Sequence, residues 1–344
     1  MNSAQELRLG TRGSQLALWQ ANTVAARIAD TGGPACRIVV IKTGGDRLQE
    51  RPLSEIGGKR LFVKEIEDAL LSGEIDLAVH SSKDMPAVLP DGLTIAGVLP
   101  RESPLDAVVL PIMAHGLGLM ANSADIHRPY AMSHEPSAMT TIDDLVAALG
   151  PLPSIGTGSV RRIAQLTRLL PGARFTGIRG NLDTRLRKLD EGAHDALVLA
   201  AAGLSRLGCA ARISLSIPAE ACVPAPGQGI VAIEIRGGDA RVRDAVARIN
   251  DAAAGDALTA ERALVETLGG GCQTPVGALA SVVDGDQLEI IAAVVALDGS
   301  RLVRGQARAA RREAAALGAR VGAQLIADGA GEILAEARRA NGER

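Results

Sequence analysis

Residues Ile75–Pro86 read IDLAVHSSKDMP, an apolar run that ends in the polar segment Ser81–Asp84. The run Ile75–His80 predicts a strand, and apolar residues at helical spacing precede it at Leu61–Leu71. Strands and helices alternate in this way through about the first 250 residues. The alternation predicts an α/β fold in which helices pack on the faces of parallel sheets.

The pattern extends to both sides of this stretch. Further strands are expected at Leu7–Leu9, Ile38–Ile41, Ser154–Ile155, Phe175–Ile178 and Ala196–Ala200, and helices at Gln15–Asp30, before Pro171 and at Leu182–Glu191. Residues 113–138 are a mixture of Pro, Gly, Met, His and Ser, and they are too many for an ordinary connection. We expect an inserted surface segment there.

The C-terminal part has a different pattern. A helix at Ala257–Leu268 precedes strand-like runs at Val276–Val283, Leu288–Leu297 and Leu302–Ala307, and two helical stretches follow. Turn sequences such as Asp284-Gly285 join consecutive strands, which favours an antiparallel sheet. The sequence therefore predicts a further α+β domain.

Composition excludes several classes of protein. The 344 residues suffice for two or three domains, and 47% hydrophobic residues are typical of a globular chain. A net charge of −2 and four aromatic residues do not favour nucleic-acid binding. The four cysteines share no C-x-x-C spacing, so neither a metal site nor a disulfide framework is expected. With no signal-peptide pattern and no unbroken apolar span, we expect a cytoplasmic protein without a membrane partner.

Polar residues follow four of the predicted strands. These segments are Thr11-Arg12-Gly13-Ser14, Ser81-Ser82-Lys83-Asp84, Gly156 to Arg162 and Ile178-Arg179-Gly180-Asn181 with Arg185 one turn later. Ligands of parallel sheets bind beyond the carboxyl ends of strands. Helix capping would explain Ser14 or Ser159 singly, and Arg187 is expected to be a solvated charge. Together the four segments predict a cleft for a polyanion.

Two residues suggest chemistry beyond anion binding. Asp84 is an acid in a basic setting, next to Lys83 and expected to face Arg12. A carboxylate there would suit stabilisation of a developing cation and proton transfer on nitrogen; a salt bridge or turn cap is the alternative. Cys272 follows three glycines, which leave its thiol accessible for a covalent attachment; an inert turn residue is the alternative.

Nine segments in order resemble the porphobilinogen deaminase family, also called hydroxymethylbilane synthases. They are TRGSQLALWQ (Thr11–Gln20), GGKRLFVKEIEDALL (Gly57–Leu71), DLAVHSSKDMP (Asp76–Pro86), GTGSVRRIAQL (Gly156–Leu166), IRGNLDTRLRKLD (Ile178–Asp190), LAAAGLSRLG (Leu199–Gly208), PAPGQG (Pro224–Gly229), AERA (Ala260–Ala263) and GGCQTPVG (Gly270–Gly277). They span nearly the whole chain, and residues 113–138 have no counterpart.

The resemblance implies three domains. Two would be lobes like those of type II periplasmic binding proteins, joined by crossing segments near Leu99–Asp106 and Pro224–Ile230. The expected bounds are 1–100 with 230–247 for domain 1, 105–224 for domain 2 and 251–344 for the α+β domain 3. The family joins four porphobilinogen molecules into hydroxymethylbilane with release of ammonia, in tetrapyrrole biosynthesis. A dipyrromethane cofactor serves as primer, and a monomer is expected.

The resemblance also implies roles for individual residues. Asp84 would bind pyrrole N–H groups, stabilise the cationic azafulvene left when ammonia departs, and assist proton movement. Cys272 would hold the dipyrromethane through a thioether. The carboxylates of cofactor and growing chain would be bound by Arg12, Ser14, Lys59, Ser81, Lys83, Thr157, Ser159, Arg161, Arg162, Arg179, Arg185 and Arg206. Phe62, with Lys59, would belong to an active-site loop over the cleft.

The chain departs from the family pattern at Gly158, where a serine is usual, and at Glu55, where a basic residue is common. A non-catalytic receptor for a small anion is the alternative that the same two-lobed fold allows. Asp84 in the cleft and Cys272 in an appended domain favour the enzyme, since a receptor needs neither.

Overall fold

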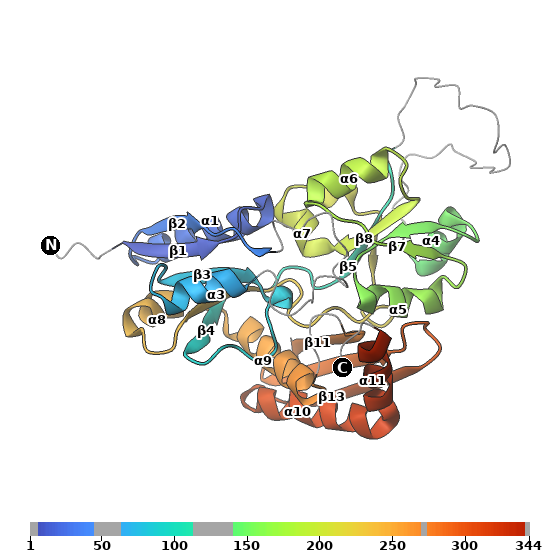
Figure 1. The fold of residues 1–344 in the computed structure, drawn as a ribbon. Helices are drawn as coiled ribbons and strands as arrows, with labels where there is room; N and C mark the ends of the chain where they lie inside the picture. Colours follow the sequence, from blue (N-terminus) through green and yellow to red (C-terminus); the bar gives the residue numbers. More distant parts are fainter. Residues whose placement is uncertain (1–5, 45–62, 113–139, 270–273, 341–344) are drawn as a thin grey trace.

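The computed structural model describes residues 6–44, 63–112, 140–269 and 274–340. Within them the chain forms two five-stranded sheets and one three-stranded sheet, each covered by helices (Figure 1). The mixed α/β fold with two lobes and a C-terminal antiparallel unit is confirmed. The expected domain bounds stay a prediction.

The first lobe, at the left of Figure 1, is a sheet with helices on both faces. Its strands are, in spatial order, β2 (Cys36–Val40), β1 (Leu7–Thr11), β3 (Leu77–Ser81), β10 (Val231–Arg236) and β4 (Leu93–Val98). Its helices are α1 (Gln15–Asp30), α3 (Lys64–Leu71) and α8 (Ala240–Ala247). Alternate residues of β3 point to opposite faces: Leu77 and Val79 pack against α1 and α8, and Ala78 packs against α3.

The second lobe repeats this strand order. Its sheet contains β7 (Arg174–Thr176), β6 (Ser154–Gly156), β8 (Ala196–Ala200), β5 (Asp106–Val109) and β9 (Leu215–Ile217). Helices α4 (Ile142–Leu149) and α5 (Val160–Leu169) cover one face, and α6 (Leu182–Asp190) and α7 (Ala201–Arg206) cover the other. The short 3₁₀ turn η3 (Ala210–Arg212) precedes β9. The expected insertion at 113–138 lies outside the described residues.

The sheets are parallel as expected except for one strand in each lobe. Strand β10 runs antiparallel to β3 and β4, and β5 runs antiparallel to β8 and β9. Each of these strands enters its sheet from the other lobe, because residues 99–105 lead from β4 to β5 and residues 218–230 lead from β9 to β10. Because the chain enters each sheet from the opposite lobe, β10 and β5 run in the opposite direction to the strands beside them.

The third unit contains β11 (Val276–Val283), β12 (Gln287–Val295) and β13 (Leu302–Ala310) in an antiparallel sheet. Helices α9 (Ala252–Thr267), α10 (Ala314–Leu325) and α11 (Gly331–Ala340) bury one face of it. The one-turn segment η4 (Arg311–Glu313) joins β13 to α10, and η5 (Ile326–Ala330) joins α10 to α11. The other face packs Ala293 and Val295 against Ala164 of the second lobe and Val223 of the segment 218–230. The expected turn at Asp284-Gly285 is confirmed, with positive φ at both residues.

Several element boundaries differ from the sequence-based expectation. Helix α9 begins at Ala252 rather than Ala257 because the Asp251 side chain accepts a hydrogen bond from the Ala254 N–H, 2.8 Å away. Strand β3 begins and ends one or two residues later than expected, since its register is fixed by pairing with β10. The apolar pattern therefore predicts the position of a helix or strand more accurately than its first and last residues.

The two crossing segments, 99–105 and 218–230, are hydrogen-bonded to each other. The Glu102 N–H donates to the Gly229 carbonyl at 3.0 Å, and the Leu99 N–H donates to the Val231 carbonyl at 3.0 Å. Gly229 has a φ of +85°, and a Cβ at this residue would lie 2.2 Å from the Glu102 carbonyl oxygen. A glycine is therefore required where the segments touch.

We expect Gly229→Ala to lower the free energy of unfolding by about 2 to 4 kcal/mol, from left-handed backbone strain plus the clash. Gly208→Ala is the matched control, because Gly208 has a φ of +71° with no atom within 4 Å of its Cβ position. Strain alone should cost this control about 1 kcal/mol. Urea unfolding followed by circular dichroism measures both, and equal losses would contradict the close approach.

Candidate active site

The carboxyl ends of parallel strands from both lobes face each other around two cavities. Strands β1 and β3 of the first lobe and β6, β7 and β8 of the second all lead into residues that line these cavities. The cavities have volumes of about 440 Å³ and about 350 Å³. We call them the third-domain cavity and the interlobe cavity, respectively.

The third-domain cavity lies where both lobes meet α9 and the start of β11. Leu258, Arg262 and Val265 of α9 and Thr274 and Val276 beside β11 form one wall. The opposite side is formed by the site residues Lys83, Asp84, Thr157, Ser159, Arg161, Arg162 and Arg179. Thr274 follows Cys272 by two residues, so this cavity reaches the chain next to the expected attachment point.

The interlobe cavity is lined by the remaining cationic candidates that the structure describes. Its lining includes Arg12, Ser14, Ser81, Lys83, Asp84, Arg179, Arg185 and Arg206. Asp84 and Arg12 line the same cavity, and the expectation that they face each other stays a prediction. Lys83, Asp84 and Arg179 belong to both cavities, so the two spaces meet at these residues.

Asp84 and Lys83 lie in η2 (Ser82–Asp84), a single 3₁₀ turn directly after β3. The Ser82 N–H donates to the Ile230 carbonyl at 3.0 Å, which ties this turn to the second crossing segment. Burial and the nearby Arg162 lower the pKa of Lys83 to about 8, although Asp84 and Asp106 act in the opposite direction. Lys83 therefore loses its proton more readily than an ordinary lysine, and it lies beside the exposed Asp84.

A buried ion pair supports the second-lobe side of the site. Asp106, at the start of β5, accepts from Arg161 Nη1 at 2.6 Å and from Arg162 Nε at 2.9 Å. Asp106 is 0% exposed and Arg161 4% exposed. Burial alone would raise the pKa of Asp106, but Arg161 and Arg162 outweigh it and hold the pKa well below the usual range.

This ion pair was not expected from the sequence. Arg161 also donates to the Val223 carbonyl at 2.8 Å, and Arg162 donates to the Val198 carbonyl at 2.9 Å. Both arginines line the third-domain cavity, and in this structure their guanidinium groups are bound by Asp106, main-chain oxygens and the side chains of Cys222 and Gln228. Their role in binding ligand carboxylates stays a prediction.

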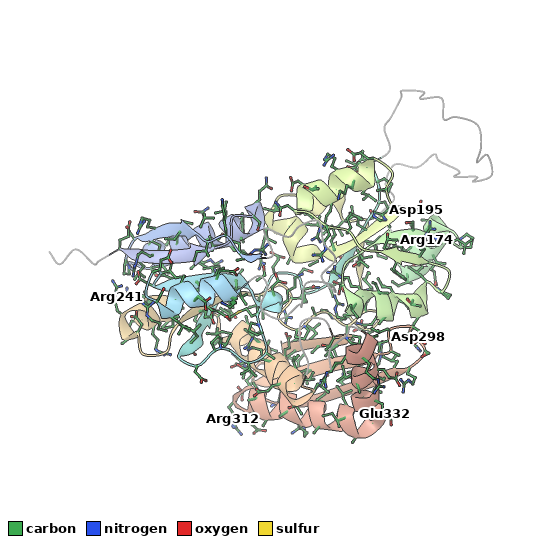
Figure 2. The ribbon with its side chains drawn as sticks, in the orientation of Figure 1. Arg174, Asp195, Arg241, Asp298, Arg312 and Glu332 are labelled. Carbon is green, nitrogen blue, oxygen red and sulfur yellow. The ribbon has the colours of Figure 1, made fainter. Side chains whose placement is uncertain are left out.

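Three other arginines differ from ordinary surface charges. Burial lowers the pKa of Arg179, Arg185 and Arg206, with nearby arginines adding to the effect at Arg185. By contrast, Figure 2 shows Arg241 and Arg312 at the outer edge of the molecule, where both are exposed. A carboxylate entering the interlobe cavity would supply counter-charge to cations held partly away from water.

Local hydrogen bonds orient these arginines. Arg185 Nε donates to the Gly180 carbonyl at 2.8 Å, and Arg206 Nη2 donates to the Gly229 carbonyl at 2.6 Å. The Arg206 guanidinium also lies over the ring of Trp19, 5.7 Å from its centroid. Arg187, expected to be solvated, is exposed and pairs with Glu191 at 2.9 Å.

The hydroxyl candidates combine a structural role with a place in the lining. Ser14 caps α1 by accepting from the Ala17 N–H at 3.3 Å, and Ser159 caps α5 by accepting from the Arg162 N–H at 3.4 Å. Ser81 accepts from Gln20 Nε2 at 2.9 Å, and Thr157 is buried. Capping and ligand binding are thus compatible for both serines, since each also faces a cavity.

Three expected site residues, Lys59, Phe62 and Cys272, lie outside the described residues. Conversely, sequence reasoning assigned no role to Asp106 or Gln228, which contact the site cations directly. Gln228 stood inside the quoted PAPGQG motif, and Asp106 at the end of a predicted crossing segment. Because both residues lie in segments predicted to cross between the lobes, the sequence could have indicated that they contact the site.

The described residues contain no group of three or more His, Cys, Asp or Glu side chains arranged to hold a metal ion. Within the same ranges, the helices are all too short or too polar to cross a bilayer. Fold and site together define a two-lobed α/β protein whose lobes meet around cavities lined by cations, with the carboxylate of Asp84 among them.

Comparisons with known proteins give the family. Residues 7–244 match the model of the porphobilinogen deaminase, dipyromethane cofactor binding domain, and residues 256–327 match the porphobilinogen deaminase C-terminal domain. A porphobilinogen deaminase of Syntrophobacter fumaroxidans is 41% identical over 97% of this chain and 98% of its own length. One of Bordetella parapertussis is 43% identical over 98% of both chains. The chain belongs to the porphobilinogen deaminase family.

Solved structures are more distant. The substrate binding protein of an amino acid ABC transporter aligns with 71% of this chain and 91% of its own, at 14% identity and a TM-score of 0.34. A TM-score this low does not support any conclusion about the fold beyond the strand order described above.

We expect Asp106→Asn to lower the free energy of unfolding by about 3 to 5 kcal/mol, because Arg161 would keep a buried charge without its partner. Since the folded-state pKa of Asp106 is lowered, its contribution is present above about pH 4 and is lost as the pH falls below that. The variant should therefore lose part of the acid-side slope of stability.

Asp68→Asn is the control for this prediction. Asp68 pairs with Lys64 at 2.6 Å on the exposed face of α3, with both side chains more than half exposed. Its replacement should change the free energy of unfolding by less than about 1 kcal/mol. Urea titrations from pH 3 to 8 compare the two variants, and similar losses would show that the buried pair is not a stabilising centre.

Proposed function

We propose that the chain carries out the reaction of its family with Asp84 as the catalytic residue and Cys272 as the cofactor attachment point. The reaction joins porphobilinogen molecules head to tail into hydroxymethylbilane and releases ammonia. The observation that supports this most directly is the position of Asp84 at the junction of two arginine-lined cavities, one of which reaches Thr274.

The residues of the third-domain cavity fit a dipyrromethane. Its volume of about 440 Å³ lies within the usual range of small-molecule sites, and it combines cations and hydroxyls with an apolar wall from α9. Lys83, Arg162 and Arg179 would hold the cofactor carboxylates. When bound, the dipyrromethane supplies the pyrrole carbon to which substrate is joined.

The interlobe cavity would take the incoming porphobilinogen and part of the growing chain. Arg12, in the loop between β1 and α1, lines this cavity from the first lobe, and Arg185 of α6 and Arg206 of α7 line it from the second. Each acetate or propionate bound to them gains about 1.5 to 3 kcal/mol per charge-assisted hydrogen bond. Ser14 and Ser81 would add neutral hydrogen bonds.

Asp84 would act on the pyrrole nitrogen. A carboxylate accepts an N–H hydrogen bond, and its negative charge stabilises the positive charge that develops as ammonia leaves. The electrostatic influence of Asp84 reaches both Lys83 in the first lobe and Arg185 in the second. As a carboxylate on the pyrrole side of the cavity, Asp84 would also assist proton movement.

A monomer in the cytoplasm is part of the same proposal. One chain supplies the residues that line both cavities, so the site needs no second copy. Cys36, Cys209 and Cys222 carry free thiols, as is usual in a reducing compartment.

Intact-mass measurement tests the cofactor. The purified protein should be heavier than its sequence by one dipyrromethane, and Cys272→Ser should lack this added mass. Cys209→Ser, which removes a half-buried thiol of the second lobe, should keep it. An unmodified wild-type protein from a host that makes porphobilinogen would contradict the proposal.

Turnover measurement tests the carboxylate. Asp84→Asn should lower turnover by about 10² to 10⁴, the range of general acid–base groups, and cofactor content should change little. Asp91→Asn, at an exposed turn before β4, should keep wild-type turnover. A value for Asp84→Asn within threefold of wild type would remove Asp84 from the mechanism.

A further inference from the structure

The carboxamide of Gln228 connects the two lobes at the site. Gln228 lies in the second crossing segment and is 0% exposed. Its Nε2 donates to the Pro104 carbonyl at 2.7 Å and to Asp106 at 2.9 Å. Its Oε1 accepts from Lys83 Nζ at 3.4 Å and from Arg162 Nη2 at 3.5 Å. One side chain thus contacts the Asp84 turn, the first crossing segment and the buried ion pair.

These four contacts fix the orientation of the amide. Its NH₂ faces two oxygens, and its oxygen faces two cations. The reverse orientation would place the NH₂ against Lys83 and Arg162 and the oxygen against Asp106. A carboxamide therefore fits here because it donates and accepts at once without a net charge.

Lys83 is surrounded by charges that act on it in opposite directions, so the uncharged acceptor Gln228 affects which protonation state Lys83 adopts. Arg161 and Arg162 of α5 face Lys83 and favour its neutral form, as does burial, whereas Asp84 in η2 and Asp106 in β5 favour the ammonium. Gln228 is an uncharged group that accepts from Lys83 while also binding Asp106. An acceptor of this kind favours the charged form of Lys83.

We propose that Gln228 is a positioning residue that holds the Lys83 ammonium of the first lobe against the Asp106–Arg162 ion pair of the second. The proposal rests on the function proposed above, because its consequence for turnover requires Lys83 and Asp84 to act on substrate. Its consequence for Lys83 itself does not depend on that function.

The test uses the holoenzyme and the variants Gln228→Leu and Gln228→Glu. The reactivity of Lys83 toward acetic anhydride, measured from pH 6 to 10 by peptide mass spectrometry, reports its neutral fraction. Gln228→Leu removes the acceptor, so the titration of Lys83 should move to lower pH by about 0.5 to 1 unit. Gln228→Glu places a negative charge there, so it should move to higher pH.

Gln165→Leu is the matched control. Gln165 is also buried and holds the same crossing segment, with Oε1 2.8 Å from the Val223 N–H and Nε2 3.0 Å from the Val223 carbonyl oxygen. It should leave the titration of Lys83 unchanged. A merely structural role of Gln228 predicts the same behaviour for Gln228→Leu and Gln165→Leu.

Opposite shifts in the two Gln228 variants, with the alkaline limb of kcat moving in the same directions, support the proposal. If the titration of Lys83 does not shift, or shifts in the same direction in both variants, the proposal is overturned. Thermal unfolding verifies that each variant is folded. If wild type fails to turn over porphobilinogen while the opposite shifts remain, the proposed function fails and the positioning role of Gln228 stands.

Discussion

A carboxylate without access to water, Asp106, organises the place where the lobes meet. Two neighbouring arginines of α5 neutralise it, and so their helix begins against the first residue of β5. The same carboxylate accepts from Gln228 in the other crossing segment. Because a buried charge is tolerated only with full hydrogen bonding, the start of α5, the start of β5 and both crossing segments are constrained together.

The third unit is attached through a second pair of this type. Arg101, in the first crossing segment, donates to Glu261 of α9 at 2.6 Å. Glu261 also accepts from the Gly227 and Ala280 N–H groups at 2.6 and 2.7 Å. The crossing segments therefore contact both lobes and the third unit, and the third unit is held beside the Asp84 turn rather than tethered loosely. A ligand fixed to the third unit would consequently lie within reach of both lobes.

Sequence indicated which residues would gather at the strand ends, because parallel strands deliver the residues that follow them to one edge of a sheet, whatever the details of packing. The roles of these residues stay a prediction. The described cationic and hydroxyl candidates accordingly line the two cavities, and the hairpin at Asp284-Gly285 is where its turn residues indicated. The antiparallel β5 and β10 were missed, since strand direction depends on which lobe the chain comes from. The Asp106 ion pair was missed because its members lie 55 residues apart and pair only through the fold.

The exchange of strands between the lobes has a consequence for biosynthesis. Strand β10 lies between β3 and β4 in the first sheet, yet it is the last of that sheet to leave the ribosome. Every strand of the second sheet, β5 to β9, precedes it in the chain. The lobe that is made first is therefore completed second, and the nascent chain carries two unpaired strand edges, on β3 and β4, until residue 236 has emerged.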